Sequence, residues 1–168
     1  MTKIIFGELL MKIIVVSDSH GNIRNLTKVL CEYHADLYIH LGDGERELDS
    51  ICRQYPEKNV YHVQGNCDMA SLSDSELLLC PDDKNVIFAV HGHRIGVKFS
   101  LVELKKAARR KGANIVLYGH THCRYCNYED GMYIINPGSV SIPRDGNKPS
   151  FAVIELLPTG ILTNIVDI

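Results

Sequence analysis

Short runs of β-branched apolar residues recur along the first two thirds of the chain, and each run stops at a cluster of Gly, Asp, Asn or His. Such runs are typical of buried strands, and they predict strands over residues 12–16, 37–41, 60–63, 86–90 and 115–118. Between them, apolar residues at helical spacing predict helices over residues 23–34, 45–54 and 101–111. This alternation indicates right-handed crossovers and a largely parallel sheet.

The pattern changes after residue 125, where strand-like runs are separated by turn sequences rich in Gly, Asn, Asp and Pro. These runs predict antiparallel hairpins built from strands over residues 132–135, 140–142, 151–156 and 161–165. Together the two parts predict an α/β fold in which two mixed β-sheets pack as a sandwich flanked by helices. Because the first strand begins at Met11, we expect a single domain over residues 11–168 and an appendage over residues 1–10.

The composition is that of an ordinary globular domain: of 168 residues, 45% are hydrophobic and 23% are charged, and the formal net charge is −2. This balance argues against a protein that coats nucleic acid, which carries a strong positive excess. No apolar run approaches the roughly 20 residues that cross a bilayer, so we expect no membrane partner. The six cysteines are scattered and no secretory signal is evident, which predicts reduced thiols and a cytoplasmic location.

Two local patterns each allow a functional interpretation and a purely structural one. The basic run over residues 105–111 is compatible with contact to nucleic acid. Cations near a helix C-terminus also interact favourably with the helix dipole, and we favour a solvated helix face. Cys123 and Cys126 have the CxxC spacing of redox motifs, but no second pair accompanies them, so we interpret the spacing as coincidence.

The chemistry of the chain is concentrated where the predicted strands end. In an α/β sheet the carboxyl ends of the strands meet at one edge, where ligands bind. Seven side chains follow these ends and should converge: Asp18, His20, Asp43, Asn66, His91, His120 and His122. Two carboxylates, one amide oxygen and four imidazoles exceed the need of one ion. With one bridging carboxylate they supply four bonds to each of two divalent ions, an arrangement that hydrolyses phosphate esters.

Other polar residues near these strand ends have roles that the sequence leaves open. His93 could face a substrate, and Arg94 could bind a phosphate oxygen. Asp68 is more typical of a residue that orients its neighbours or caps a helix than of a metal ligand. The run over residues 136–139 either forms only a turn or supports the ligands from behind. Three further histidines are interpreted as surface or core residues: His34, His40 and His62.

Five short motifs together resemble the calcineurin-like metallophosphoesterase family: Asp18-x-His20, Gly42-Asp43, Gly65-Asn66-x-Asp68, His91-Gly92 and Gly119-His120-x-His122. A sixth motif resembles the small bacterial and archaeal phosphodiesterase branch of that family: Asn136-Pro137-Gly138-Ser139-Val140-Ser141. The resemblance runs in order from residue 11 to about residue 156. It implies two mixed sheets between helices and a metal-dependent phosphodiesterase that acts on a small phosphate ester.

The resemblance also implies how the seven side chains divide between two ions. The first ion would be held by Asp18, His20, Asp43 and His122. The second would be held by the bridging Asp43 together with Asn66, His91 and His120. The family leads us to expect Mn²⁺, Fe, Ni²⁺ or Zn²⁺, and this donor set suits each of them.

One position departs from the pattern of many family members. Where they carry a His next to the Asn, as a general acid near the leaving group, this chain has Cys67. A thiol is a weaker proton donor than an imidazolium. We therefore expect hydrolysis of activated esters with good leaving groups rather than of alkyl phosphates.

Two other functions stay open beside the phosphodiesterase. A phosphomonoesterase would use the same ligands, because the chemistry at phosphorus is shared. A protein-binding scaffold is the other, since the retromer subunit with this fold resembles the sequence but works through protein contacts. The intact ligand set favours an enzyme over a scaffold. The natural substrate, the physiological metal and any homo-oligomer are not readable from the sequence.

Overall fold

The computed structural model describes residues 11–69 and 71–168, so the expected appendage over residues 1–10 lies outside the described residues. No helix within those two ranges is long and apolar enough to cross a membrane. In chain order the elements are β1 (Met11–Val16), α1 (Ile23–Glu32), β2 (Leu37–His40), α2 (Glu45–Gln54), β3 (Val60–His62), β4 (Glu76–Leu79), β5 (Ile87–Val90), the 3₁₀ helix η1 (His93–Ile95), α3 (Val102–Arg110), β6 (Ile115–Tyr118), β7 (Arg124–Glu129), β8 (Met132–Pro137), β9 (Ser150–Leu157) and β10 (Gly160–Asp167).

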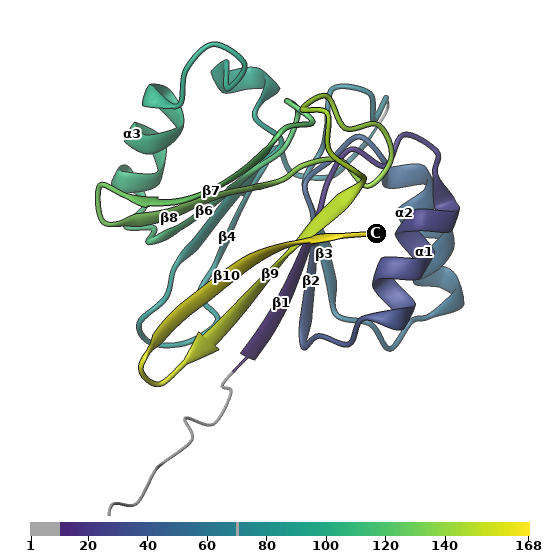
Figure 1. Cartoon of the computed structure of the whole chain (residues 1–168), viewed down its shortest axis with the longest axis horizontal. Coiled ribbons are helices and arrows are strands. Elements are labelled where there is room, and N and C mark those ends of the chain that lie inside the picture. The colour runs from purple at the N-terminus through teal and green to yellow at the C-terminus, as the bar shows by residue number, and fades with distance from the viewer. Residues whose placement is uncertain (1–10, 70) are drawn as a thin grey trace, which may run out of the picture.

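The described strands form two five-stranded mixed sheets. In the first, ordered β10-β9-β1-β2-β3, strands β1, β2 and β3 run parallel, whereas β9 and β10 pair antiparallel. In the second, ordered β4-β5-β6-β8-β7, strands β5, β6 and β8 run parallel and the edge strands β4 and β7 pair antiparallel. Figure 1 shows the sheets stacked between α1 and α2 on one side and α3 on the other. The predicted sandwich of mixed sheets flanked by helices is confirmed.

Strand β1 contributes to two hydrophobic cores at once. Ile13 and Val15 point into the layer between the sheets, whereas Ile14 and Val16 pack beneath α1 and α2. All four side chains are fully buried. Burying each one stabilises the fold by about 1.5–3 kcal/mol. Because successive strand residues face opposite sides, a strand covered on both faces requires an apolar residue at every position.

The three α-helices lie where the apolar spacing predicts them, with ends that differ by no more than two residues from the prediction. Helix α1 begins at Ile23 because the side chain of Asn22 accepts the backbone N–H of Asn25 at 3.1 Å. It buries Leu26, Val29 and Leu30 against the first sheet. Helix α3 packs on the second sheet in the same way.

The structure corrects several strand predictions. The strand predicted over residues 140–142 is wrong, because this segment is a loop. The N–H of Val140 donates to the carbonyl of Ser17 at 3.2 Å, and its carbonyl accepts the side chain of Asn25, so no neighbouring strand pairs with it. The sequence pattern does not predict the half-exposed edge strands β4 and β7, nor η1. Strand β8 pairs antiparallel with β7, as expected of a hairpin, but it also pairs parallel with β6, which was not predicted.

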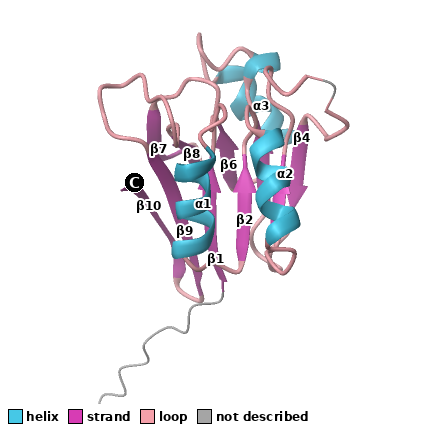
Figure 2. Ribbon diagram, turned by 90° about the vertical axis from the view of Figure 1, so that its right-hand side faces the viewer, coloured by secondary structure: helices cyan, strands magenta, loops and turns pink. Residues whose placement is uncertain are grey.

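The carboxyl ends of β1, β2 and β3 and those of β5 and β6 meet at one edge of the sandwich. Figure 2 shows the loops gathered at this upper edge, above the strands. Backbone hydrogen bonds tie neighbouring loops together there: the N–H of Asp18 donates to the carbonyl of Gly42 at 3.0 Å, and that of Gly119 donates to the carbonyl of His91 at 3.0 Å. Both sheets therefore supply side chains to the same place.

Candidate metal centre

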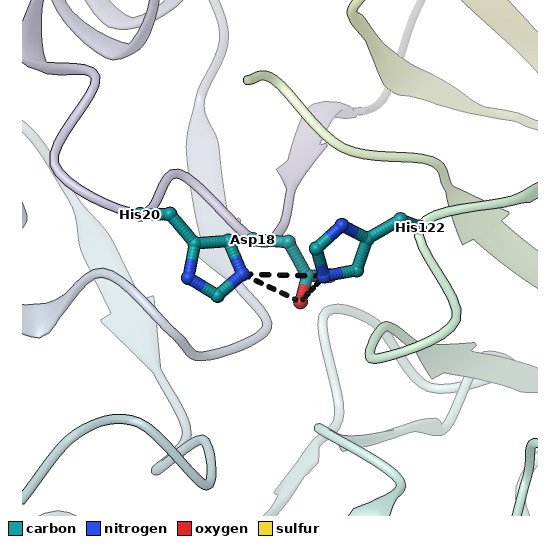
Figure 3. Close-up of side chains that lie close together, drawn as sticks. All are labelled: Asp18, His20 and His122. Carbon is teal, nitrogen blue, oxygen red and sulfur yellow. Dashed lines mark hydrogen bonds and ion pairs between the residues drawn. The ribbon is translucent and has the colours of Figure 1, made fainter. Parts of the chain in front are cut away.

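One group of side chains comes from the loops that follow β1 and β6. The Nε2 atoms of His20 and His122 lie 3.2 Å apart. Asp18 Oδ1 lies 3.1 Å from Nε2 of His122 and 3.7 Å from Nε2 of His20. Figure 3 shows the three side chains pointing toward one another. Their donor atoms lie within 4.8 Å of each other, a spacing compatible with ligation of one ion.

A second group comes from the loops that follow β2, β3, β5 and β6. His91 Nε2 lies 3.4 Å from Asp43 Oδ2 and 3.1 Å from Asn66 Oδ1. The same nitrogen lies 3.2 Å from Nδ1 of His120. The group therefore combines two imidazoles with a carboxylate and an amide oxygen, a donor set suited to borderline divalent metals.

Asp43 joins the two groups. Its Oδ2 lies 3.8 Å from Nε2 of His20 and 3.4 Å from Nε2 of His91, so one carboxylate oxygen faces both. Asp43 and His20 follow strands of the first sheet, whereas His91 follows a strand of the second. The combined cluster exists only because the two sheets pack with these ends together. All seven side chains predicted from the strand ends are brought to it.

Hydrogen bonds orient two of the rings. Nδ1 of His91 donates to the carbonyl of Leu41 at 2.7 Å, and Nδ1 of His122 donates to the carbonyl of Ile142 at 2.8 Å. A neutral imidazole that donates from Nδ1 carries its lone pair on Nε2. In both rings that atom faces the cluster, which is the orientation a metal ligand requires.

The backbone is strained at most of these positions. Within the described residues, six non-glycine residues have a positive φ, and five of them belong to the cluster: Asp18 (54°), His20 (42°), Asp43 (59°), His120 (67°) and His122 (59°). Side-chain-bearing residues rarely adopt this left-handed conformation, and it costs about 1–3 kcal/mol where it persists. Such strain concentrates at functional sites, so the backbone itself marks the cluster as one.

The protonation states suit metal binding. Burial opposes the ionisation of Asp18, but its contacts with His122 and His20 outweigh this and hold the pKa of the carboxyl well below its usual range. Burial likewise opposes the ionisation of Asp43, and His91 outweighs it, so the pKa falls to about 2. Burial and the nearby His91 lower the pKa of His120 to about 4. Charged carboxylates and a neutral imidazole are the forms that bind metals.

A buried atom without a partner supports the same conclusion. Asp18 Oδ1 is buried and accepts no hydrogen bond from any described residue. It faces the ring nitrogen of His122 whose lone pair points into the cluster. A buried carboxylate oxygen left in this way is costly, and a cation between it and the ring removes the cost. The residues present therefore fit divalent metal ions.

Comparison with known proteins identifies the family. Residues 11–158 match the calcineurin-like phosphoesterase superfamily domain. The chain belongs to this family. It is 34% identical over 149 residues to the probable metallophosphoesterase YsnB of Bacillus subtilis, covering 87% of this chain and 85% of that protein. It is 30% identical over 171 residues to the phosphodiesterase YfcE of Escherichia coli, covering 87% and 88%.

Solved structures agree on the fold of this phosphoesterase. A predicted phosphoesterase from Streptococcus pneumoniae superimposes with a TM-score of 0.78 at 27% identity, covering 93% of this chain and 98% of that one. Vacuolar Protein Sorting 29 from Cryptosporidium parvum also has a TM-score of 0.78, at 18% identity and coverage of 94% and 91%. At that identity the second likeness shows the fold alone.

The predicted role of Asp68 as an orienting residue is confirmed in the phosphoesterase. Its carboxylate accepts four backbone N–H groups at 2.8–3.0 Å, those of Asp43, Gly44, Glu45 and Gly65. Three of these donors precede or begin α2, where the N–H groups lack partners within the helix. The carboxylate thus caps α2 and holds the turn that carries Asp43.

The run over residues 136–139 supports the clustered side chains from behind, the second of its two interpretations. The hydroxyl of Ser139 donates to the carbonyl of Asp18 at 2.8 Å and accepts the N–H of Ile142 at 2.9 Å. The carbonyl of Ile142 in turn accepts Nδ1 of His122. The side chain of Asn136 donates to the carbonyl of Gly119 at 3.1 Å. One turn thereby positions clustered residues on the loops that follow both β1 and β6.

A chain of buried polar groups beneath the clustered side chains was not predicted. The N–H of Gly42 donates to Nδ1 of His40 at 3.1 Å, so Nε2 carries the proton and lies 3.0 Å from the hydroxyl of Ser19. Ser19 donates to Glu47 Oε1 at 2.7 Å. The N–H of Gly21 donates to the same oxygen at 2.6 Å. The available signal was Ser19 itself, a small hydroxyl residue set between two predicted ligands.

Cys67, His93 and Arg94, which were predicted to lie beside the metal ligands, are at the margin of the cluster. The N–H of Cys67 donates to Asp43 Oδ1 at 2.7 Å, and burial together with Asp43 raises the pKa of the thiol to about 11. The ring of His93 lies 5.3 Å from that of His91 and 6.0 Å from that of His120, measured between centroids. The exposed Arg94 donates to the side chain of Gln64 at 3.1 Å.

The remaining sequence patterns supply none of the seven clustered side chains of the phosphoesterase. The basic run lies on α3 and just beyond it, and Lys105, Arg109 and Lys111 all pair with acidic side chains, which agrees with a solvated helix face. Cys123 and Cys126 are both free thiols. His34 is exposed, and His62 contacts Glu45 and Ser73, as expected of surface or satisfied histidines.

Proposed function

We propose that this metallophosphoesterase is a phosphodiesterase that holds two divalent ions between its sheets and acts on a small phosphate ester in the cytoplasm. The observation that carries the proposal is Asp43, whose Oδ2 faces both His20 and His91. A shared carboxylate is what distinguishes a two-metal site from two separate clusters.

Each of the two groups of side chains would hold one ion. The first ion would be held by Asp18, His20, Asp43 and His122. The second would be held by Asp43, Asn66, His91 and His120. When bound, such ions lower the pKa of a water molecule and neutralise the charge on a phosphoryl group. The nitrogen and oxygen donors suit Mn²⁺, Fe, Ni²⁺ or Zn²⁺.

Three residues complete the proposed site. Cys67 would give a proton to the departing oxygen of the substrate, since its backbone is held against Asp43. His93 would face the phosphate beside the ring of His91. Arg94 would bind a phosphate oxygen with its guanidinium group, after exchanging its contact with Gln64.

A phosphodiesterase is favoured over the two alternatives by different observations. The name of the relative YfcE, a phosphodiesterase at 30% identity, favours diesters over monoesters. The complete set of metal-binding side chains and the strained backbone that carries them favour an enzyme over a scaffold. A scaffold would have no need to maintain five strained residues at such a cost.

A hydrolysis assay with defined metal content tests the proposal. The protein is stripped with a chelator, reloaded with Mn²⁺, and given bis(4-nitrophenyl) phosphate or 4-nitrophenyl phosphate. We expect two equivalents of Mn²⁺ and hydrolysis that favours the diester. His122→Ala should lose metal and at least about a hundredfold in rate, whereas the exposed control His34→Ala should retain both.

Each contrary outcome has a distinct meaning. Preference for the monoester would identify a phosphomonoesterase on the same ligands. A single equivalent of Mn²⁺ would contradict the shared role of Asp43. Two bound equivalents without hydrolysis of either ester would favour the scaffold.

A further inference from the structure

A hollow of about 540 Å³ opens beside Cys67, between the start of α2 and the loop that follows β3. Arg46 and Asp49 of α2 line one side. Cys67, Met69 and Leu72 of the loop line the other. Its size suits a ring system rather than a macromolecule.

The loop that carries the apolar side of the hollow is anchored at both ends. At one end Asp68 accepts four backbone N–H groups. At the other, the hydroxyl of Ser73 donates to Glu45 Oε1 at 2.8 Å and lies 2.6 Å from Nε2 of His62. The first anchor also holds Asp43 of the metal cluster.

Two large apolar side chains of this loop are nevertheless exposed to solvent. Met69 is 90% exposed and Leu72 is fully exposed. Water contact with side chains of this size is unfavourable, and covering them with an apolar group is favourable in proportion to the area removed.

Cys67 connects this hollow to the metal cluster. The thiol lines the hollow, and its sulfur lies within 4.8 Å of the donor atoms of His20 and Asp43. A phosphorus atom held at the cluster would therefore have one of its ester groups directed past Cys67 and over Met69 and Leu72.

We propose that the hollow binds the leaving group of the substrate and that this group is a flat aromatic ring. The inference rests on the proposed function. The thioether of Met69 contacts ring edges favourably, and the guanidinium of Arg46 can stack on a ring face. In the hydrolysis the water oxygen bonds to phosphorus and the P–O bond to the ring-bearing group breaks. A poor leaving group takes the proton of the Cys67 thiol, and the proton that the water loses replaces it. A leaving group as good as nitrophenolate departs as the anion, and the proton of the water is released.

Two diesters separate the leaving group from the group that stays on phosphorus. Bis(4-nitrophenyl) phosphate carries two rings, and methyl 4-nitrophenyl phosphate carries only the one that leaves. With the Mn²⁺-loaded protein we expect Leu72→Ala and Met69→Ala to lower kcat/KM about five- to tenfold for both esters, mainly through KM. The matched control is Leu162→Ala, at a 56%-exposed leucine on the edge strand β10, which should stay within twofold for both.

Other results would overturn the proposal. A loss confined to the two-ring ester would place the retained group in the hollow. Unchanged values for both esters would mean that neither group enters it.

A binding measurement separates this inference from the proposed function. In protein labelled at its methionine methyl groups, 4-nitrophenol should shift the NMR signal of Met69 and leave that of the buried Met132 in place. A shift without any hydrolysis would refute the phosphodiesterase while supporting the hollow. Hydrolysis without a shift would support the phosphodiesterase and refute the binding of the leaving group in the hollow.

Discussion

The carboxylate of Asp68 accepts the backbone N–H of Asp43 at 2.8 Å. Asp68 is not one of the proposed metal ligands, but it holds Asp43, the residue that joins the two groups of ligands. The same carboxylate caps α2 and accepts the N–H of Gly65. A single acidic side chain therefore couples the stability of α2 to the geometry of the cluster. This relationship explains why an aspartate follows Asn66 and Cys67 without binding metal itself.

Replacing Asp68 tests that coupling. Asp68→Asn removes the charge and turns one acceptor into an NH₂ group that faces backbone donors. We expect the free energy of unfolding of the metal-free protein to fall by about 2–3 kcal/mol, measured by urea denaturation. The exposed Asp83→Asn should change it by less than about 0.5 kcal/mol. Equal stability of the two variants would contradict the capping role.

The same carboxylate predicts a dependence of stability on pH. Burial opposes the ionisation of Asp68, but the four N–H donors outweigh it and lower its pKa from the ordinary 3.8. A lowered pKa in the folded state stabilises the protein above pH 4 or so, and this contribution is lost as the pH falls through the folded-state value. The stability difference between the parent and Asp68→Asn should therefore be constant near neutrality and shrink in acid. A difference that grows in acid would refute this account.

Gly65 tests how closely the backbone must approach Asp43. A Cβ at this position would lie 2.1 Å from Asp43 Oδ1 and 2.2 Å from its backbone nitrogen, which no side-chain rotation relieves. Gly65→Ala should displace Asp43 and weaken Mn²⁺ binding at least tenfold or so, measured by calorimetry. In Gly131→Ala the new Cβ meets no atom within 4 Å, so only a strained φ of 78° should reduce stability. Its metal affinity should match the parent.

Ser139 tests the support that lies behind the ligands. Its hydroxyl holds the carbonyl of Asp18 and the N–H of Ile142, whose carbonyl orients His122. Ser139→Ala should weaken Mn²⁺ binding about 10- to 100-fold while the fold persists. Ser141→Ala removes a nearby hydroxyl outside this chain of contacts and should leave affinity unchanged. Parental affinity in both variants would reduce the segment to a turn.

Cys67→His tests whether the thiol limits proton donation. A stronger donor matters most for a poor leaving group, so turnover of an alkyl phosphodiester should rise about tenfold or more. Turnover of bis(4-nitrophenyl) phosphate should change much less, because nitrophenolate leaves without help. Cys80→His, at another exposed thiol, should alter neither rate. An unchanged or lower rate on the alkyl ester would overturn the general-acid role of Cys67.

Much of the cluster was predictable because strand ends are visible in the apolar pattern. The runs that end before Asp18 and Asp43 mark β1 and β2, and parallel pairing brings their carboxyl ends to one edge. The seven clustered positions followed from that rule and from motifs shared with the family. The edge strands β4 and β7 were missed because half-exposed strands show only weak patterning, and their pairing depends on neighbours distant in sequence.

Three features were decided only by the tertiary structure. Face-to-face packing of the sheets sets His91 3.4 Å from Asp43, although they lie on separate sheets. The left-handed backbone at Asp18 and His122 is strained locally and persists because surrounding contacts impose it. The hollow beside Cys67 depends on where Asp68 and Ser73 anchor one loop. Periodicity and strand-end chemistry are local along the chain, so the sequence alone determined the buried strands, the three α-helices and the side chains that gather at the strand ends. Distances between side chains on different sheets depend on the packing of whole layers, and only the folded chain establishes them.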